Sequence, residues 1–237
     1  MLDDYDTEEL LQTALTQKDQ LIHFAISFQQ MMMLYESAVK CVTTQLDILK
    51  EDFRVKGVHI PIESVSGRVK QPMSIAEKLD RYGYETSVES MMANLNDIAG
   101  VRVRCKYISD VYTVRDTLLS RENITLVKEK DYIKEPKENG YRSLHLIVEV
   151  PVILTDKTEM VRCEIQIRTL SMDSWAALEH HMRYKRGSEG DAQTDAELCQ
   201  CAELAFASDV KMQQIAERLG IFDEKETRLD ISRFLGV

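Results

Sequence analysis

Residues 161–169 read VRCEIQIRT, and apolar and polar side chains alternate along this whole stretch. Successive side chains of a β-strand point to opposite faces of the sheet, so one face of this strand is apolar and the other is polar. A merely solvated face would typically mix threonine, lysine and serine. This polar face carries instead, in order, Arg162, Glu164, Gln166 and Arg168. The stretch predicts a strand that packs against the core with one face and presents reactive groups on the other.

Two further segments alternate in the same way, GVRVRCKY at 100–107 and SLHLIVEV at 143–150, and ITLVKEKDYI at 124–133 does so more weakly. A helical pattern at about 109–121 allows a crossover after the first of them. The segment PVILTDKTEM at 151–160 is short enough for an antiparallel hairpin. With a short extended segment after the first helical region, the sequence predicts an α+β fold, a mixed and mostly antiparallel β-sheet of about five strands with flanking helices.

The flanking helices follow from apolar residues at three- and four-residue steps. The expected ranges are 7–50 as one long helix or two, then 73–82, 87–95, 170–186, 194–219 and a short terminal helix ending in FLGV. Two glycines and two prolines interrupt the helical pattern at 55–72. We therefore expect an N-terminal helical extension at 1–54, a core at 55–186 that contains the sheet, and C-terminal helices at 187–237, all in one compact unit.

The bulk composition excludes several classes of protein. A net charge of −10 argues against a nucleic-acid coat or a polybasic membrane binder, because the overall field repels phosphates. No apolar run approaches the ~20 residues that span a bilayer. Five cysteines form no C-x-x-C pair, so we expect reduced thiols and no structural zinc. The sequence predicts a cytoplasmic protein with no membrane or DNA partner, in which any phosphate site is a local cluster of bases.

Two carboxylates stand on or beside the predicted polar face. Asp97 directly precedes the strand at 100–107, and Glu164 lies in the middle of the strand at 161–169. Carboxylate oxygens at the edge of a sheet suit Mg²⁺ that is also held by substrate phosphates. Basic side chains that could clamp a polyphosphate lie near them in an otherwise acidic chain: Arg68, Lys70, Lys78, Arg102 and Arg104.

Tyr141 follows an Asn-Gly turn signal at the start of the strand at 143–150. It is either an ordinary turn residue or a platform for a flat ligand. Lys137, Arg142 and His145 surround it in the sequence. An aromatic ring beside such donors suits a nucleobase, which stacks on the ring while its phosphates meet the bases.

Five motifs in order, SGRVK with Ser74 and Lys78 downstream, NDIAGVRV, KENGYRSLH, EIQIRT and WAALEH, resemble the RelA/SpoT-type alarmone synthetases. Their order and the chain length of 237 residues are similar to those of the small, single-domain members. The resemblance covers roughly residues 55–186. It implies a nucleotidyltransferase-like synthetase domain that uses Mg²⁺ to transfer the β,γ-diphosphate of ATP to the 3′-hydroxyl of GDP or GTP. The products are AMP and the alarmones ppGpp or pppGpp of the stringent response.

The resemblance also implies a role for each matching residue. Asp97 and Glu164 would hold Mg²⁺, and Glu164 would take the proton from the attacking hydroxyl. On the ATP side, Arg68 and Arg102 would flank adenine, while Lys70, Ser74 and Lys78 would hold phosphates. On the other side, Tyr141 would stack on guanine, with the nucleotide positioned by Lys137, Arg142, His145, Gln166 and Glu179. Arg104 and Arg168 remain open between a substrate contact and a structural ion pair with a helix.

Further expectations rest on the family. Its long members carry a hydrolase built around a His-Asp pair, and none of the five histidines here precedes an aspartate, so we expect no alarmone hydrolysis. A homotetramer is expected, with an alarmone or RNA as candidate regulator, although Ser64 stands where alarmone-activated members carry an aromatic residue. Two rivals stay open: another nucleotidyl- or pyrophosphoryl-transferase acting on RNA ends, and a non-catalytic oligomer that binds nucleotides or RNA.

Overall fold

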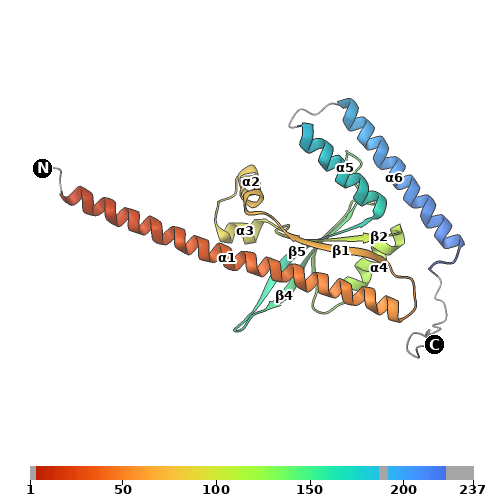
Figure 1. The fold of residues 1–237 in the computed structure, drawn as a ribbon, viewed down its shortest axis with the longest axis horizontal. Coiled ribbons are helices and arrows are strands. Elements are labelled where there is room, and N and C mark those ends of the chain that lie inside the picture. The colour runs from red at the N-terminus through yellow and green to blue at the C-terminus, as the bar shows by residue number, and fades with distance from the viewer. Residues whose placement is uncertain (1–3, 187–191, 223–237) are drawn as a thin grey trace, which may run out of the picture.

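The computed structural model describes residues 4–186 and 192–222 of the chain (Figure 1). Its centre is a five-stranded sheet in the order β1-β2-β5-β4-β3. The strands are β1 (Ile62–Val69), β2 (Ala99–Cys105), β3 (Thr125–Asp131), β4 (Leu144–Ile153) and β5 (Thr158–Thr169). Strands β2 and β5 run parallel and every other neighbouring pair runs antiparallel. The predicted α+β fold with a mixed, mostly antiparallel sheet is confirmed.

Six helices accompany the sheet in the described residues. They are α1 (Asp4–Val55), α2 (Pro72–Tyr82), α3 (Val88–Asn94), α4 (Ile108–Leu119), α5 (Leu170–Arg186) and α6 (Ala192–Arg218). The first helical region forms one helix of 52 residues rather than two. It runs along the sheet, and its N-terminal part projects beyond the rest of the molecule (Figure 1). The predicted terminal helix ending in FLGV lies outside the described residues.

The hairpin between β4 and β5 is tighter than the sequence pattern suggests. Most of the connecting segment at 151–160 is itself paired, because the ladder continues to Ile153 opposite Thr158. A hydrogen bond of 2.8 Å from the backbone N–H of Leu154 to the carbonyl oxygen of Lys157 closes the turn. β5 therefore begins three residues before the alternation at 161–169 becomes regular.

The core lies between the apolar face of the sheet and α1 with α4. Helix α1 contributes buried side chains at steps of three and four residues, namely Met31, Tyr35, Ala38, Val42, Leu46 and Leu49. From the sheet come the alternate residues Val101, Val103, Cys105, Leu144, Leu146, Cys163, Ile165 and Ile167. Helix α1 approaches the sheet so closely that a Cβ at Gly67 would collide with Val39. Burial of this face leaves the opposite, polar face of the strands available for a site.

None of the described helices is both long enough and apolar enough to cross a membrane.

Candidate active site

The sheet register sets polar residues of four strands side by side. Arg102 of β2 pairs with Gln166 of β5, Gln166 pairs with His145 of β4, and His145 pairs with Lys130 of β3. Directly paired residues of neighbouring strands project from the same face, so these four side chains form a row across the sheet. The tertiary fold thus assembles one polar surface from segments that are up to 64 residues apart in the sequence.

Asp97 sits in the loop before β2 and is held by two lysines. Nζ of Lys70 lies 2.8 Å from Oδ2, and Nζ of Lys78 lies 2.7 Å from Oδ1. Burial alone would raise the pKa of the Asp97 carboxyl, but the hydrogen bonds and charges of the two lysines outweigh it, and the pKa lies below its ordinary value. Asp97 is therefore a carboxylate at neutral pH, with a lysine ammonium group beside each of its two oxygens.

Glu164 of β5 is held by two neighbours on the same face. Its Oε1 lies 3.2 Å from Nδ1 of His145, and its Oε2 accepts a hydrogen bond of 2.8 Å from Nε2 of Gln166. Burial alone would raise the pKa of the Glu164 carboxyl. The contacts with His145 and then with Gln166 lower it by more, so the pKa of Glu164 also lies below its ordinary value. Glu164 is ionised and oriented by both partners.

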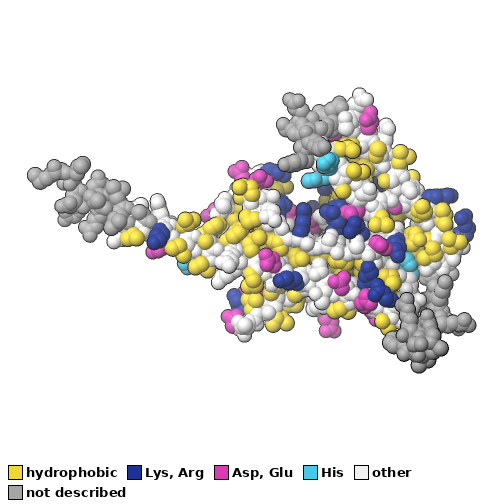
Figure 2. All heavy atoms as spheres, viewed as in Figure 1, with side chains coloured by type: hydrophobic (Ala, Val, Ile, Leu, Met, Phe, Trp, Pro, Cys, Tyr) yellow, Lys and Arg dark blue, Asp and Glu magenta, His cyan; other side chains and the backbone are white. Residues whose placement is uncertain are grey.

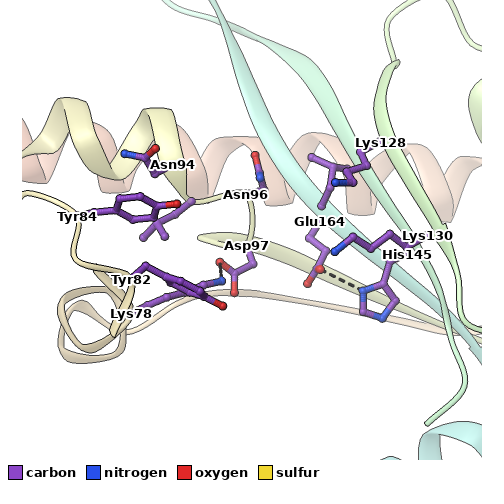
Figure 3. Close-up of a pocket in the computed structure, with 12 residues that line it drawn as sticks. Lys78, Tyr82, Tyr84, Asn94, Asn96, Asp97, Lys128, Lys130, His145 and Glu164 are labelled. Atoms are coloured by element: carbon purple, nitrogen blue, oxygen red, sulfur yellow. Dashed lines mark hydrogen bonds and ion pairs between the residues drawn. The ribbon is translucent and has the colours of Figure 1, made fainter. Parts of the chain in front are cut away.

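Two hollows meet at these carboxylates. The first, of about 330 Å³, is lined by Arg68 of β1, Arg102 of β2 and Gln166 together with Asp97 and Glu164. The second, of about 240 Å³, is lined by the same two carboxylates and by Lys78, Tyr82, Tyr84, Lys128, Lys130 and His145. Asp97 and Glu164 point into this second hollow from two sides (Figure 3). The arrangement offers two spaces on either side of one carboxylate pair.

Positive charge is concentrated around these hollows. Lys and Arg side chains gather on the face between α2 and α5, in a chain whose net charge is −10 (Figure 2). Four predicted ATP ligands come from β1, the segment between β1 and α2, α2 itself and β2, in that order: Arg68, Lys70, Lys78 and Arg102. Ser74 lies one helical turn before Lys78 on α2, on the same side of the helix. A local basic cluster of this kind can bind phosphates despite the acidic overall charge.

The Tyr141 side chain is contacted at its hydroxyl by two polar side chains and at its ring by two cations. Its hydroxyl is 2.7 Å from Nε2 of His145, and it accepts a hydrogen bond of 2.6 Å from NH2 of Arg168. Nζ of Lys137 lies 4.8 Å from the centre of its ring, and the guanidinium of Arg168 lies 5.1 Å from it. Gly140, with φ of 84°, makes the turn that leads into this position. The tyrosine is part of the polar surface and not only a turn residue.

Arg168 and Arg104 both face Asp173 near the start of α5. NH1 of Arg168 lies 3.2 Å from Oδ1 of Asp173, and NH1 of Arg104 lies 3.9 Å from Oδ2. NH1 of Arg102 lies 3.3 Å from Oδ1 of the same aspartate. The two arginines left open by the sequence thus form ion pairs with a helix, and Arg168 in addition contacts Tyr141 and Gln166. Asp173 thus holds three arginines, one of which, Arg102, lines the first hollow.

Of two predicted acceptor-side residues, Arg142 contacts a helix and Glu179 contacts a loop from its own helix. NH2 of Arg142 is 2.9 Å from Oε1 and 3.0 Å from Oε2 of Glu203 on α6. Glu179 of α5 accepts a hydrogen bond of 3.1 Å from Nδ2 of Asn139. Asn139 belongs to the loop at 132–143 between β3 and β4, which carries Tyr141 and is called the tyrosine loop below. The structure therefore sets Arg142 apart from the row of Arg102, Gln166 and His145, and substrate contacts by Arg142 and Glu179 remain predictions.

Sequence reasoning missed several residues that line the second hollow, namely Tyr82, Tyr84, Asn94, Asn96, Lys128 and Lys130. For the two lysines a signal exists in the sequence, since they stand at alternate positions of the strand at 124–133 and must share a face. The tyrosines and asparagines come from loops and helix ends, whose placement no periodicity predicts. Asp173 was missed as well, because an acidic residue in a first helical turn is usual on its own.

The residues present fit Mg²⁺. Asp97 and Glu164 are ionised, point into one hollow and supply the hard oxygen donors that this ion prefers. The described residues form no group of three or more His, Cys, Asp or Glu side chains that could hold a metal by themselves. Two carboxylates beside basic groups match an ion that shares its coordination with substrate phosphates and water.

Comparison with known proteins shows the family of this chain. Residues 67–189 match the family model described as the region found in RelA / SpoT proteins. The chain is 41% identical over 206 residues to the GTP pyrophosphokinase YwaC of Bacillus subtilis. The matched region covers 87% of this chain and 98% of YwaC.

Solved structures give the same result. Small alarmone synthetase 2 of Bacillus subtilis superimposes with a TM-score of 0.74 at 43% identity, over 80% of this chain and 98% of the other. Small alarmone synthetase 1 of the same organism, bound to its product pppGpp, gives a TM-score of 0.77 at 34% identity, over 81% and 98%. The family prediction is confirmed, and the chain belongs to the RelA/SpoT synthetase family.

Proposed function

We propose that this protein is a GTP pyrophosphokinase that makes the alarmones ppGpp and pppGpp. It transfers the β,γ-diphosphate of ATP to the 3′-hydroxyl of GDP or GTP and releases AMP. The observation that carries this proposal is the pair of hollows that share Asp97 and Glu164. A reaction between two nucleotides needs two spaces that open onto one set of charge-neutralising groups, because phosphoryl-type transfer depends mainly on positioning and electrostatic stabilisation.

The hollow beside β1 and β2 is the ATP side in this proposal. Arg68 and Arg102 line it, and their flat guanidinium groups can stack on the two faces of adenine. Lys70 and Lys78 contact Asp97, which lines both hollows, and they hold the phosphates together with Ser74, one helical turn before Lys78 on α2. Both lysines donate to Asp97. When substrate and Mg²⁺ bind, the lysines would contact the phosphates and the Asp97 carboxylate would be free to hold the ion.

The hollow beside β3 and β4 accepts the guanine nucleotide. Tyr141 stacks on the base, at the mouth of the strand that carries His145. Lys137 and His145 position its phosphates and sugar, and Gln166 links the two sides through its contacts with Glu164 and Arg168. Glu179, which holds Asn139 of the same loop, and Arg142 complete the acceptor side as we propose it.

Glu164 is the general base. Its carboxylate is ionised and held by His145 and Gln166, so it can take the proton of the 3′-hydroxyl as that oxygen attacks the β-phosphorus of ATP. The bond between the α,β-bridging oxygen and the β-phosphorus breaks, and AMP leaves with that oxygen. Mg²⁺, held by Asp97 and Glu164 when bound, supplies charge neutralisation for the phosphates. No covalent intermediate with the protein is needed.

The test is identification of the products. Purified protein with ATP, GDP and Mg²⁺ should give AMP and guanosine tetraphosphate, resolved by anion-exchange chromatography and mass spectrometry. Release of pyrophosphate from ATP would instead mean attack at the α-phosphorus, and a diphosphate on an added RNA 3′ end would support the RNA-directed rival. Added alarmone alone should remain intact, because we propose synthesis without hydrolysis.

We also propose a homo-oligomer, a tetramer by analogy with the family, located in the cytoplasm. Support comes from the projecting part of α1, where large apolar side chains are exposed: Leu21, Ile22, Phe24 and Ile26. Helix surfaces of this kind usually pack against another chain. Sedimentation equilibrium at micromolar concentration tests the proposal, and a monomer would contradict it.

A further inference from the structure

We propose that helix α6 positions the loop that carries Tyr141, and that Glu203 sets the affinity for the acceptor nucleotide by holding Arg142. This inference rests on the proposed role of Tyr141 in binding the guanine nucleotide. Helix α6, at Ala192–Arg218, lies beyond residues 67–189, the segment that matches the RelA/SpoT family model. Glu203 contacts no reacting group and acts through another residue, so it is a positioning residue.

The first link is the pair Arg142 and Glu203. NH2 of Arg142 contacts both carboxylate oxygens of Glu203, and the guanidinium lies 4.2 Å from the centre of the Phe206 ring one turn further along α6. The Arg142 side chain is only 9% exposed, whereas that of Glu203 is 58% exposed. A nearly buried guanidinium depends strongly on its partner, because an unpaired buried charge is costly. Arg142 is next to Tyr141 in the chain, so the contact that holds the Arg142 side chain also restrains the backbone of Tyr141.

The second link is close backbone packing. A Cβ at Gly140 would collide with Cβ of Ala202, which lies at 2.6 Å, and would also touch Cys199. Ala202 and Leu198 of α6 form a small apolar cluster with Trp175 of α5, and Tyr141 packs against it. The indole N–H of Trp175 donates a hydrogen bond of 2.9 Å to the carbonyl oxygen of Leu198. The tyrosine loop therefore lies directly against α6.

Helix α6 is itself anchored to the body of the fold. Asp209 accepts a hydrogen bond from the Thr169 hydroxyl at the end of β5, at 2.5 Å. Oε1 of Gln213 accepts from the N–H of Ser109 at 3.2 Å and from its hydroxyl at 3.1 Å, which joins α6 to the start of α4. A helix attached at these points can transmit a fixed position to the loop that it contacts.

The two supports of Tyr141 are therefore different. Its hydroxyl is held from the sheet by His145 and Arg168, and its backbone is held from α6 through Gly140 and Arg142. The proposed ATP ligands belong to β1, β2, α2 and the segment between β1 and α2, and β1 and β2 lie at the end of the sheet opposite to β4 and β3. Loosening the α6 contact should therefore weaken binding of the guanine nucleotide and leave ATP binding nearly unchanged.

The experiment compares Glu203→Gln with Glu197→Gln. Both remove one negative charge from α6, but the contact of Glu197 is a hydrogen bond from Gln193 within the same helix. Calorimetry on the full chain measures the Kd for GDP and, separately, for a non-hydrolysable ATP analogue. We expect Glu203→Gln to raise the Kd for GDP roughly three- to tenfold, the range for losing a partly exposed ion pair, while the ATP-analogue Kd changes less than about twofold. Glu197→Gln should change neither.

A second variant separates positioning from folding. Arg142→Lys keeps the charge but loses the planar fork, and it should raise the Kd for GDP in the same way. The double variant, with Glu203→Gln and Arg142→Lys together, should bind GDP no more weakly than the weaker-binding of the two single variants, because both substitutions act through one contact. Hydrogen exchange at the amides of residues 137–142 should become faster in each, and by more than any fall in the melting temperature explains.

Two outcomes overturn the inference: an unchanged Kd for GDP in Glu203→Gln, or equal losses for GDP and the ATP analogue together with a lower melting temperature. Failure of the proposed function looks different. A wild-type protein that binds GDP but makes no tetraphosphate would refute the pyrophosphokinase, while the effect of Glu203→Gln on GDP binding would still support a positioning role for α6. A wild-type protein that does not bind GDP would overturn both.

Discussion

The Tyr141 hydroxyl lies 2.7 Å from Nε2 of His145, and Nδ1 of the same imidazole lies 3.2 Å from Oε1 of Glu164. The proposed platform for guanine and the proposed base therefore belong to one chain of contacts. A change at the tyrosine can reach the carboxylate through a single side chain. This connection determines what each substitution below should do.

Removal of the Tyr141 ring should affect one substrate only. Tyr141→Ala should weaken GDP binding by about 1–3 kcal/mol, the contribution of one base stacked on an aromatic ring, and leave ATP binding nearly unchanged. Tyr141→Phe is the matched control, because it keeps the ring and loses only the contacts of the hydroxyl with His145 and Arg168. It should bind GDP better than Tyr141→Ala does. Calorimetry with GDP and with an ATP analogue measures both, and equal losses for the two nucleotides would indicate a folding role.

Glu164→Gln should separate turnover from binding. Glutamine keeps an oxygen and the size of the side chain but cannot accept the proton, so kcat should fall by about 10²–10⁴. Nucleotide affinities in the absence of Mg²⁺ should be largely retained. Glu159→Gln on the same strand is the control, because Glu159 pairs with the surface residue Lys157 and should keep full activity. Normal turnover in Glu164→Gln would eliminate it as the base.

The lysines of β3 should contribute charge to the second hollow. Lys130→Met should weaken binding of the guanine nucleotide by about 1 kcal/mol, the range for a charged contact near the surface, and Lys128→Met should act in the same direction. The loss should shrink at high salt, because added ions screen the lysine in the wild-type protein. Binding titrations at two salt concentrations test this, with Lys157→Met in the β4–β5 turn as control. A loss that does not depend on salt would argue against a charge effect.

Asp209 should make stability depend on pH. It is 5% exposed, and burial raises the pKa of its carboxyl, although hydrogen bonds from Thr169 and Ser171 oppose the shift. The folded state therefore holds the proton more tightly than the unfolded chain. The associated stability is present below the unfolded pKa and is lost as the pH rises through the higher folded pKa.

Asp209→Asn removes this loss and keeps an oxygen that can accept from Thr169. Its free energy of unfolding relative to the wild-type protein should therefore rise as the pH increases from 4, and should then level off. Chemical denaturation across a pH series measures the difference, with Asp156→Asn at an exposed turn as control. A difference that is constant with pH would show that folding does not shift the pKa of the Asp209 carboxyl.

Much of the fold is readable from the sequence, because the local patterns are strong. Strict alternation at 161–169 and 100–107 correctly assigns each side chain to the core face or the polar face, since the period of a strand is two. Boundaries are less predictable. Pairing with β4 extends β5 back to Thr158, and that extension depends on the partner strand rather than on the alternation of β5 itself.

Motif and strand face agree for four residues of the candidate site. Arg102, His145, Glu164 and Gln166 are chosen from the sequence and lie together on the polar face, and their roles stay predictions. Sequence reasoning does not place Lys128 and Lys130 at this site, because weak alternation in a charged strand does not reveal which other strand lies beside it. Register with His145 depends on pairing between distant segments.

Tyr141 and Arg142 show where local information ends. The sequence by itself determined the strand faces, the family motifs and the turn at Gly140, because each depends on neighbours along the chain. Only the tertiary structure decided that Tyr141 joins His145 and Arg168 while the adjacent Arg142 turns to Glu203, 61 residues away. The physical reason is that buried charges take whichever partner the packing of distant elements provides, and that packing minimises the free energy of the whole chain rather than of any one segment.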